Sequence, residues 1–380
     1  MQFKRWIAVS VSLLASAGCG SGGSASPSPG PQDSGTASTD TGTIVADGGA
    51  DTSTIDTGTP ADSAAPLDAP SFDAPADSGQ SAGDASGDGE AGDAGTGSVG
   101  PYGADGPSTV TTAAFMVPST NGTFTTTAYI PSGAGPFPVV ILSSGFFQDG
   151  VAYAPYAQRL ASWGILTFLR DDPNLAEGTP AVAADVSYTV ATWLSATNAD
   201  ASSMLHGKIA AGKVGLAGHS RGGQIALLAA EGGARGLIQG VFGLDPVDTS
   251  MSGDPEARTT IATIGVPLAF IGETTDSAAS GCAPAADDFL VLYQAAASPA
   301  VAITAVNADH TMFEDPASCS FCTLCTAGTA SQPLVLATAV RYLTAFFARQ
   351  LLGDASVGAA FAGAGASQDV TAGTVQVMAK

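Results

Sequence analysis

Segments that look like strands alternate with segments that look like helices from about residue 109 to residue 352, and this alternation limits the folds open to the chain. Several apolar runs are continuous rather than alternating, as expected for strands that are covered on both faces. Over about 245 residues, this pattern predicts one α/β domain with a mostly parallel sheet and helices on both faces. The expected strands are 124–130, 139–143, 165–169, 214–217, 238–244, 267–271 and 300–306.

The clearest helical stripe begins near Pro180, where Val182, Val186, Val190 and Leu194 recur every four residues. Ligand sites in such α/β sheets lie at the carboxyl ends of the strands, so candidate site residues are expected in the loops that follow the strands. The other expected helices are 156–163, 224–231, 285–296 and 334–351.

The first 18 residues have the features of an export signal. Lys4 and Arg5 precede an apolar stretch at 6–17 that is too short to span a membrane comfortably. The Ala-Gly-Cys ending resembles a bacterial lipoprotein signal, in which Cys19 is lipidated after cleavage, and the alternative is an ordinary signal peptide cut after Ala17. Both alternatives predict an exported protein, either a cell-envelope lipoprotein or a secreted one.

Residues 19–105 are rich in Gly, Ser, Ala, Thr, Pro and Asp, and they contain no Lys or Arg. Such a segment cannot bury enough apolar surface to offset the entropy cost of ordering, so it predicts a disordered acidic tether. The α/β domain is expected at 106–352, and the small-residue segment 353–380 is expected to form a C-terminal tail.

Acidic residues outnumber basic ones 34 to 12, which gives a formal net charge of −22. The basic footprint of a nucleic-acid-binding protein is therefore missing, and attraction to anionic lipid is disfavoured. The only long apolar run is N-terminal, which excludes a polytopic membrane protein. We expect a monomer whose membrane contact, if any, is a lipid anchor at Cys19.

Ser220 is the candidate nucleophile, because it lies in a G-x-S-x-G motif with the right surroundings. A strand-like segment, 213–217, precedes it and a helix-like segment, 224–230, follows it, which is the context of a nucleophile elbow. Ser81 lies in a second match to the motif, but no strand precedes it. Since a chain with 48 Gly is expected to contain chance matches, Ser81 is interpreted as an ordinary tether residue.

A serine nucleophile needs a base, and the chain has three His. His219 is the neighbour of Ser220 and is expected to point away from it and to line the pocket. His206 precedes the strand that leads to Ser220, which is the wrong end of that strand. His310 follows the strand 300–306 and comes last in the chain order Ser, acid, His, so it is the predicted base.

Two aspartates are candidates for the acid that orients the base. Asp245 directly follows the strand 238–244, and Pro246 after it fixes the backbone and ends the strand. Asp276 follows the next strand, in a loop rich in small residues, and stays open as the alternative. We favour Asp245.

The oxyanion hole of such a site needs two backbone N–H groups. One is expected from Arg221, directly after the nucleophile, and the other from Phe146, in the loop after the strand 139–143. The Phe146 side chain is expected either to form a wall of the acyl site or to pack in the core.

Four cysteines remain if Cys19 is lipidated, and in an exported chain an even set predicts two disulfides with three possible pairings. A metal or iron–sulfur site is disfavoured, because the cysteines lack matching ligand pairs and the compartment is oxidising. We therefore expect no metal and no cofactor, and a bridge that ties two loops around the site. The four cysteines are Cys282, Cys319, Cys322 and Cys325.

Several motifs resemble the α/β-hydrolase superfamily, and in particular its chlorophyllase branch and its cutinase-like polyester hydrolases. The resemblance covers about 109–352 and implies the α/β-hydrolase fold and hydrolysis of a small-molecule or polymeric ester through an acyl-enzyme. The chlorophyllase-like motif places the acid at Asp245, whereas the cutinase-like pattern places it at Asp276. The chlorophyllase-like motifs are Gly-His-Ser-Arg-Gly-Gly at 218–223, Leu-Asp-Pro-Val-Asp at 244–248, Cys-Ala-Pro at 282–284 and Ala-Asp-His at 308–310. The cutinase-like motifs are Pro-Val-Val-Ile at 138–141, Gly-Phe at 145–146 and Val-Pro-Leu-Ala-Phe-Ile-Gly-Glu at 266–273.

Two functional classes follow from this reasoning. The first is a serine carboxylic-ester hydrolase with a triad of Ser220, His310 and an aspartate. The second is a non-catalytic, surface-exposed binding lipoprotein built on a hydrolase fold. Reaction of Ser220 with a fluorophosphonate distinguishes them, because only an activated serine is labelled.

Overall fold

The computed structural model describes residues 100–380 apart from 121, 172–176, 233, 250–255, 277–280, 318–324, 359–360 and 362–363. The expected export signal, Cys19 and Ser81 lie outside the described residues, as does the expected tether up to residue 99.

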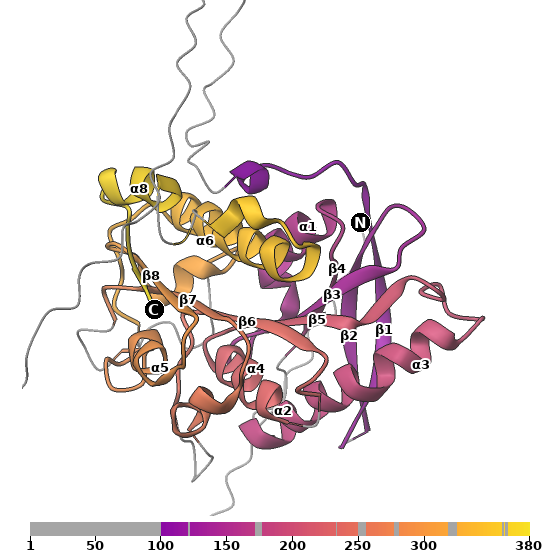
Figure 1. The fold of residues 1–380 in the computed structure, drawn as a ribbon. Helices are drawn as coiled ribbons and strands as arrows, with labels where there is room; N and C mark the ends of the chain where they lie inside the picture. Colours follow the sequence, from indigo (N-terminus) through magenta and orange to yellow (C-terminus); the bar gives the residue numbers. More distant parts are fainter. Residues whose placement is uncertain are drawn as a thin grey trace, which may run out of the picture. The chain divides into compact units, whose positions relative to one another are not determined.

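One nine-stranded sheet, in the order β1-β2-β4-β3-β5-β6-β7-β8-β9, forms the centre of the described domain (Figure 1). The six strands from β4 to β8 in this order are parallel, and antiparallel pairs close both ends of the sheet. The predicted α/β-hydrolase fold with a mostly parallel sheet is confirmed. The strands are β1 (Val110–Ser119), β2 (Gly122–Pro131), β3 (Phe137–Ser143), β4 (Leu166–Arg170), β5 (Ile209–His219), β6 (Ile238–Leu244), β7 (Leu268–Glu273), β8 (Ala300–Ala305) and β9 (Val375–Ala379).

Helices cover both faces of the sheet: α1 and α6 lie on one face, and α2, α4 and α5 lie on the other (Figure 1). The stripe predicted from Val182 to Leu194 forms α2, a π-helical turn and the start of α3. The α-helices are α1 (Ala154–Ser162), α2 (Thr179–Tyr188), α3 (Leu194–Ala199), α4 (Arg221–Glu231), α5 (Phe289–Ala295), α6 (Gln332–Phe347) and α8 (Ala364–Thr371). The 3-10 helices are Gly100–Gly103, Gly150–Tyr153, Ala257–Thr259, Ile261–Thr263, His310–Phe313 and Ala355–Val357, and the π-helical turns are Thr189–Trp193 and Ala348–Leu352.

The sheet separates two hydrophobic cores, and β3 shows why its apolar run is continuous. Val140 and Leu142 pack in the core that contains residues of α1 and α6. Val139 and Ile141 point to the opposite face, into the core that contains residues of α2, α4 and α5. Since successive side chains of a strand alternate between faces, a strand covered on both sides needs apolar residues at every position.

The edge strands β1 and β9 were not predicted from the sequence. In β1 most side chains are exposed or half-buried, and Pro118 lies within the strand, so the apolar signal of a buried strand is weak. The segment 353–380, which the sequence analysis set apart as a tail, supplies β9, and β9 pairs antiparallel with β8 from Val375 to Ala379. The sheet of the domain therefore extends beyond residue 352.

The domain also begins before residue 106. Tyr102, in the last residues assigned to the tether, is buried, packs edge-on against the Trp163 ring at 4.8 Å and donates a hydrogen bond to Asp354 Oδ2 at 2.5 Å. Tyr102 therefore anchors the segment just before residue 106 to the domain.

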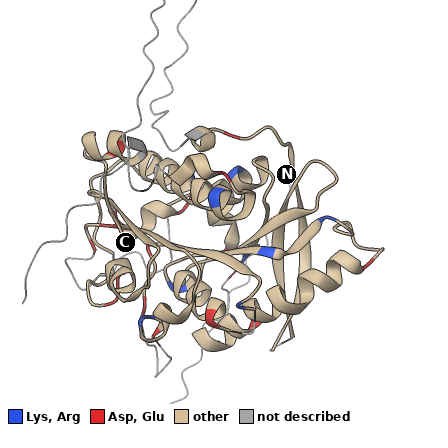
Figure 2. Cartoon of the chain, viewed as in Figure 1, with Lys and Arg blue, Asp and Glu red and all other residues tan. Residues whose placement is uncertain are grey.

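Charged residues are sparse on the described domain, and Lys and Arg are spread over separate elements (Figure 2). Several of them form local ion pairs: Arg159 Nε lies 2.8 Å from Asp105, and Arg341 lies 2.6 Å from Asp369. The second pair connects α6 with α8, so it fastens the C-terminal segment to the domain. None of the helices in the described residues combines the length and the apolar character that crossing a membrane requires.

Replacing Gly215 with Ala should destabilise the fold, because the new methyl group would lie 2.3 Å from the ring of the buried Phe347. We expect a loss of about 1–3 kcal/mol, typical of overpacking. Gly212, on the same strand, is the matched control, since a Cβ there meets nothing within 4 Å. Denaturant unfolding measures both variants, and equal midpoints for Gly215→Ala and Gly212→Ala would contradict this packing argument.

Candidate active site

Ser220 lies at the sharp turn between β5 and α4, with φ 54° and ψ −125°. A positive φ at a residue other than glycine is strained by about 1–3 kcal/mol and persists only where neighbouring contacts hold it. Here Ser220 N donates to Leu244 O at 3.1 Å, and Ser220 O accepts from Gly223 N at 2.9 Å. The turn therefore joins the end of β6 to the start of α4, and it presents the serine at the N-terminus of that helix.

Close backbone contacts explain why this turn needs glycine on both sides of the serine. A Cβ on Gly222 would lie 2.2 Å from Ser143 O and 2.4 Å from Ser144 O, at the end of β3. A Cβ on Gly218 would lie 2.0 Å from Gly222 O. The G-x-S-x-G pattern thus reflects how closely α4 approaches the loop after β3.

Strained backbone is concentrated on this side of the sheet. Four described residues other than glycine have a positive φ, and each follows the carboxyl end of a parallel strand: Phe147 after β3, Ser220 after β5, Asp245 after β6 and Asn307 after β8. Such strain clusters at functional sites, where the surrounding structure holds it.

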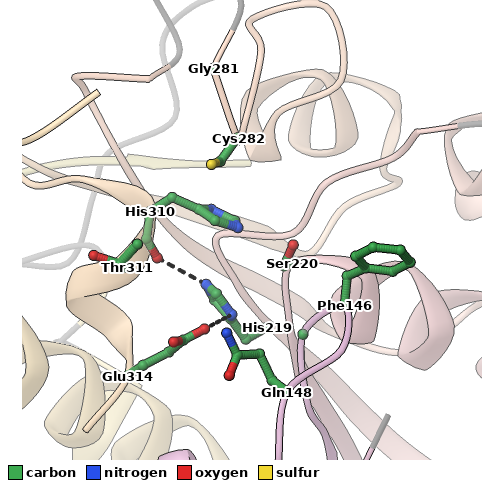
Figure 3. A pocket seen from close by; sticks show the side chains of 10 residues that line it. Phe146, Gln148, His219, Ser220, Gly281, Cys282, His310, Thr311 and Glu314 are labelled. Carbon is green, nitrogen blue, oxygen red and sulfur yellow. Dashed lines mark hydrogen bonds and ion pairs between the residues drawn. The ribbon is translucent and has the colours of Figure 1, made fainter. Parts of the chain in front are cut away.

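His310 begins the 3-10 helix after β8, and its ring meets Asp245 at the end of β6. The distance between His310 Nδ1 and Asp245 Oδ2 is 2.6 Å, and both side chains are buried. Because a carboxylate only accepts, this contact places a proton on Nδ1 and leaves Nε2 for chemistry. In Figure 3 the His310 ring points toward Ser220 across the cavity.

Asp276, the alternative acid, has different partners. Its Oδ1 accepts a hydrogen bond from Thr326 N at 2.5 Å, and its backbone N–H donates to Glu273. The structure therefore brings Asp245 to the Nδ1 of His310 and uses Asp276 to hold the loop that follows Cys325.

Buried carboxylates set the protonation of this region. Burial lowers the pKa of His310, but the hydrogen bond and charge of Asp245, together with the charges of Glu314 and Asp276, raise it above the ordinary value. Burial and the nearby charge of Asp245 raise the pKa of Glu273 to about 8. Glu273 was not predicted as a site residue from the sequence. Its position at the carboxyl end of β7, where ligand sites of parallel sheets lie, could have indicated it.

Two cavities of about 170 and 160 Å³ meet at Ser220. Phe146 and Cys282 also line both cavities, so they form shared walls. The first cavity is further lined by Gly145, Gln148, His219, Gly281, His310, Thr311 and Glu314, and the second by Thr179, Arg221, Gln224, Val247 and Thr249 (Figure 3 shows the first).

The two residues predicted for the oxyanion hole line the second cavity together with Ser220. Arg221 is the first residue of α4, and Phe146 is half-buried in the loop after β3. The Arg221 guanidinium carbon lies 5.7 Å from the centre of the Phe146 ring, and its Nε donates to Thr179 Oγ1 at 3.2 Å. The Phe146 side chain therefore forms a cavity wall, one of the two roles the sequence analysis left open.

A disulfide joins Cys282 to Cys325, with 4.9 Å between their Cα atoms. It links the loop after β7 to the segment that follows His310, and it is one of the pairings left open by the sequence; Cys319 and Cys322 lie outside the described residues. Asp276 lies within 4.8 Å of both sulfurs, but the disulfide uses both cysteines, so they offer no thiolate to a metal.

Replacing Asp245 with Asn should lower the pKa of His310, because the hydrogen bond and the charge of Asp245 raise it while burial lowers it. The matched variant Asp276→Asn should give a smaller decrease, since it keeps the contact at Nδ1. NMR titration of the imidazole signals measures both, and the chain has only three His to assign. A larger decrease in Asp276→Asn would contradict the contact between His310 and Asp245.

Comparison with known proteins agrees with this architecture. A search of curated proteins finds no match. A protein-family model described as Chlorophyllase matches residues 107–363, which include every element from β1 to α6 and all the residues of the two cavities. The chain therefore belongs to the chlorophyllase family.

Proposed function

We propose that this protein is a serine carboxylic-ester hydrolase in which Ser220, His310 and Asp245 form the catalytic triad. Membership of the chlorophyllase family supports a hydrolase. The observation that carries the finer proposal is the 2.6 Å contact between His310 and Asp245, beside a cavity that His310 and Ser220 both line. A strained serine at a helix N-terminus, opposite a histidine held by a buried carboxylate, is the arrangement that nucleophilic catalysis requires.

The proposed reaction has two halves. In the first, Ser220 Oγ attacks the ester carbonyl carbon while His310 Nε2 takes its proton, and Asp245 stabilises the resulting imidazolium. His310 then gives the proton to the leaving alkoxide, and the acyl group stays on Ser220. In the second half, His310 removes a proton from water, the hydroxide attacks the acyl-enzyme, and the carboxylic acid leaves as Ser220 regains its proton.

Each half passes through a tetrahedral intermediate with a negative oxygen. We propose that the backbone N–H groups of Arg221 and Phe146 stabilise this oxygen. Arg221 N lies at the positive end of the α4 dipole, which favours the developing charge.

The two cavities separate the parts of the ester. His310 lines the first cavity but is absent from the lining of the second. Because His310 must protonate the leaving alkoxide, the alcohol part belongs in the first cavity, between His310 and Phe146. The acyl part then extends into the second cavity, past Val247 and Thr249.

A fluorophosphonate should label the protein at Ser220, as shown by mass spectrometry of the modified peptide. Ser220→Ala should abolish labelling and lower kcat by on the order of 10⁶-fold, because the nucleophile is lost. Ser81→Ala is the matched control, since Ser81 lies in the other G-x-S-x-G match, and it should behave like the parent. An unlabelled parent protein would instead support a non-catalytic binding protein.

Narrowing one cavity should affect one side of the ester. Thr249→Phe should lower kcat/KM for esters with long acyl chains at least tenfold relative to acetates, and it should leave the dependence on alcohol length unchanged. Gln148→Phe, in the first cavity, should lower kcat/KM for esters with long alcohol parts at least tenfold and leave the dependence on acyl length unchanged. Two series of esters, one varied in acyl length and one in alcohol length, measure these effects. If Thr249→Phe affected alcohol length and Gln148→Phe affected acyl length, the assignment of the two cavities would be reversed.

A further inference from the structure

A group of hydrogen-bonded side chains lies beneath the first cavity, and none of its members is a proposed catalytic residue. It consists of Tyr153, His219 and Glu314, which we call the buried cluster. Their exposed fractions are 0%, 1% and 1%. Burying polar groups this deeply destabilises the fold unless they form hydrogen bonds, so the hydrogen bonds among these three side chains are expected to fix their positions.

Tyr153 contacts three separate segments of the chain through one hydroxyl group. Its oxygen accepts a hydrogen bond from Gly145 N at 3.1 Å, in the loop that carries Phe146. It lies 2.8 Å from His219 Nδ1, next to the nucleophile, and 3.1 Å from Glu314 Oε1. Burial, together with the charge of Glu314, raises the pKa of Tyr153 well above its ordinary value, so the hydroxyl keeps its proton.

His219 links Tyr153 to the backbone of His310, the proposed base. Its Nε2 lies 3.0 Å from the backbone carbonyl oxygen of His310. A carbonyl oxygen only accepts, so Nε2 is the donor and carries a proton. The centres of the His219 and His310 rings are 4.5 Å apart, and His219 Nδ1 lies 3.2 Å from Glu314 Oε1 (Figure 3).

We propose that Tyr153, His219 and Glu314 are positioning residues that hold the oxyanion loop at Gly145 in register with the backbone of His310. This inference rests on the proposed esterase function. In a triad enzyme, the base and the oxyanion donors must address the same carbonyl group, and a misplacement of about 1 Å can cost about 10²-fold in rate. The buried cluster is the chain of hydrogen bonds that joins the two loops through the side chain next to Ser220.

Tyr156 offers a matched control for Tyr153. It lies three residues along, is equally buried, and donates its hydroxyl hydrogen to Phe313 O at 2.9 Å. Removing either hydroxyl group therefore loses a buried hydrogen bond to the same segment, but only Tyr153 contacts Gly145 and His219.

The first experiment compares Tyr153→Phe with Tyr156→Phe in the full chain, using a p-nitrophenyl ester. We expect kcat to fall 10- to 100-fold in Tyr153→Phe, KM to change less than threefold, and fluorophosphonate labelling to slow in parallel. Tyr156→Phe should keep kcat within threefold, although its unfolding midpoint should also fall because it loses a buried hydrogen bond. Equal kcat values for the two variants would overturn the inference while leaving the proposed function intact, and an unlabelled parent would overturn the proposed function.

The second experiment uses Glu314→Gln and a pH profile. The titratable groups that face His310 are Asp245, Asp276, Glu314 and His219. The charge of Glu314 adds to that of Asp245 in raising the pKa of His310, so its removal should let His310 stay neutral at lower pH. The acidic limb of kcat/KM should therefore shift to lower pH. An acidic limb at the same pH as in the parent would overturn the effect assigned to the charge of Glu314, and a kcat equal to that of the parent would overturn its part in positioning the Gly145 loop.

Discussion

The close approach of α4 to the end of β3 is the contact on which the rest of the site depends. It brings the backbone of Gly222 against the carbonyl oxygens of Ser143 and Ser144, with no space for a Cβ. This contact holds Ser220 in its strained conformation and sets the distance from the nucleophile to the loop that carries Phe146. The strained conformation persists because Ser220 N donates to Leu244 O at the end of β6, and Ser220 O accepts from Gly223 N in α4.

Electrostatics around His310 follow from burial. The buried carboxyl groups of Asp245, Asp276 and Glu314 act on His310, and that of Glu273 lies near Asp245. Ionised carboxylates favour the imidazolium that forms during proton transfer, and burial opposes it. Burial and the charge of Asp245 raise the pKa of Glu273 to about 8, which favours its neutral form beside Asp245.

Distance along the chain explains which site residues could be predicted. Ser220 has a local signature, because strand, turn and helix follow one another within a few residues. His310 and Asp245 were reached through their positions after strands, since parallel strands bring their carboxyl ends to one edge. Tyr153 and Glu314 have no such signal: they are 161 residues apart and meet only because the 3-10 helix before α1 packs against the loop after His310.

The sequence by itself determined the fold class, the six parallel strands and the helices that cover them. Continuous apolar runs indicate strands buried on both faces, and helical stripes indicate helices buried on one face. It left open the choice between Asp245 and Asp276, since both follow strands and differ only in which strand end meets the histidine. In the tertiary structure Asp245 contacts His310 Nδ1, whereas Asp276 accepts a hydrogen bond from the backbone N–H of Thr326. It also decided the edge strands β1 and β9, because an edge strand is recognised by the partner with which it pairs rather than by its own sequence.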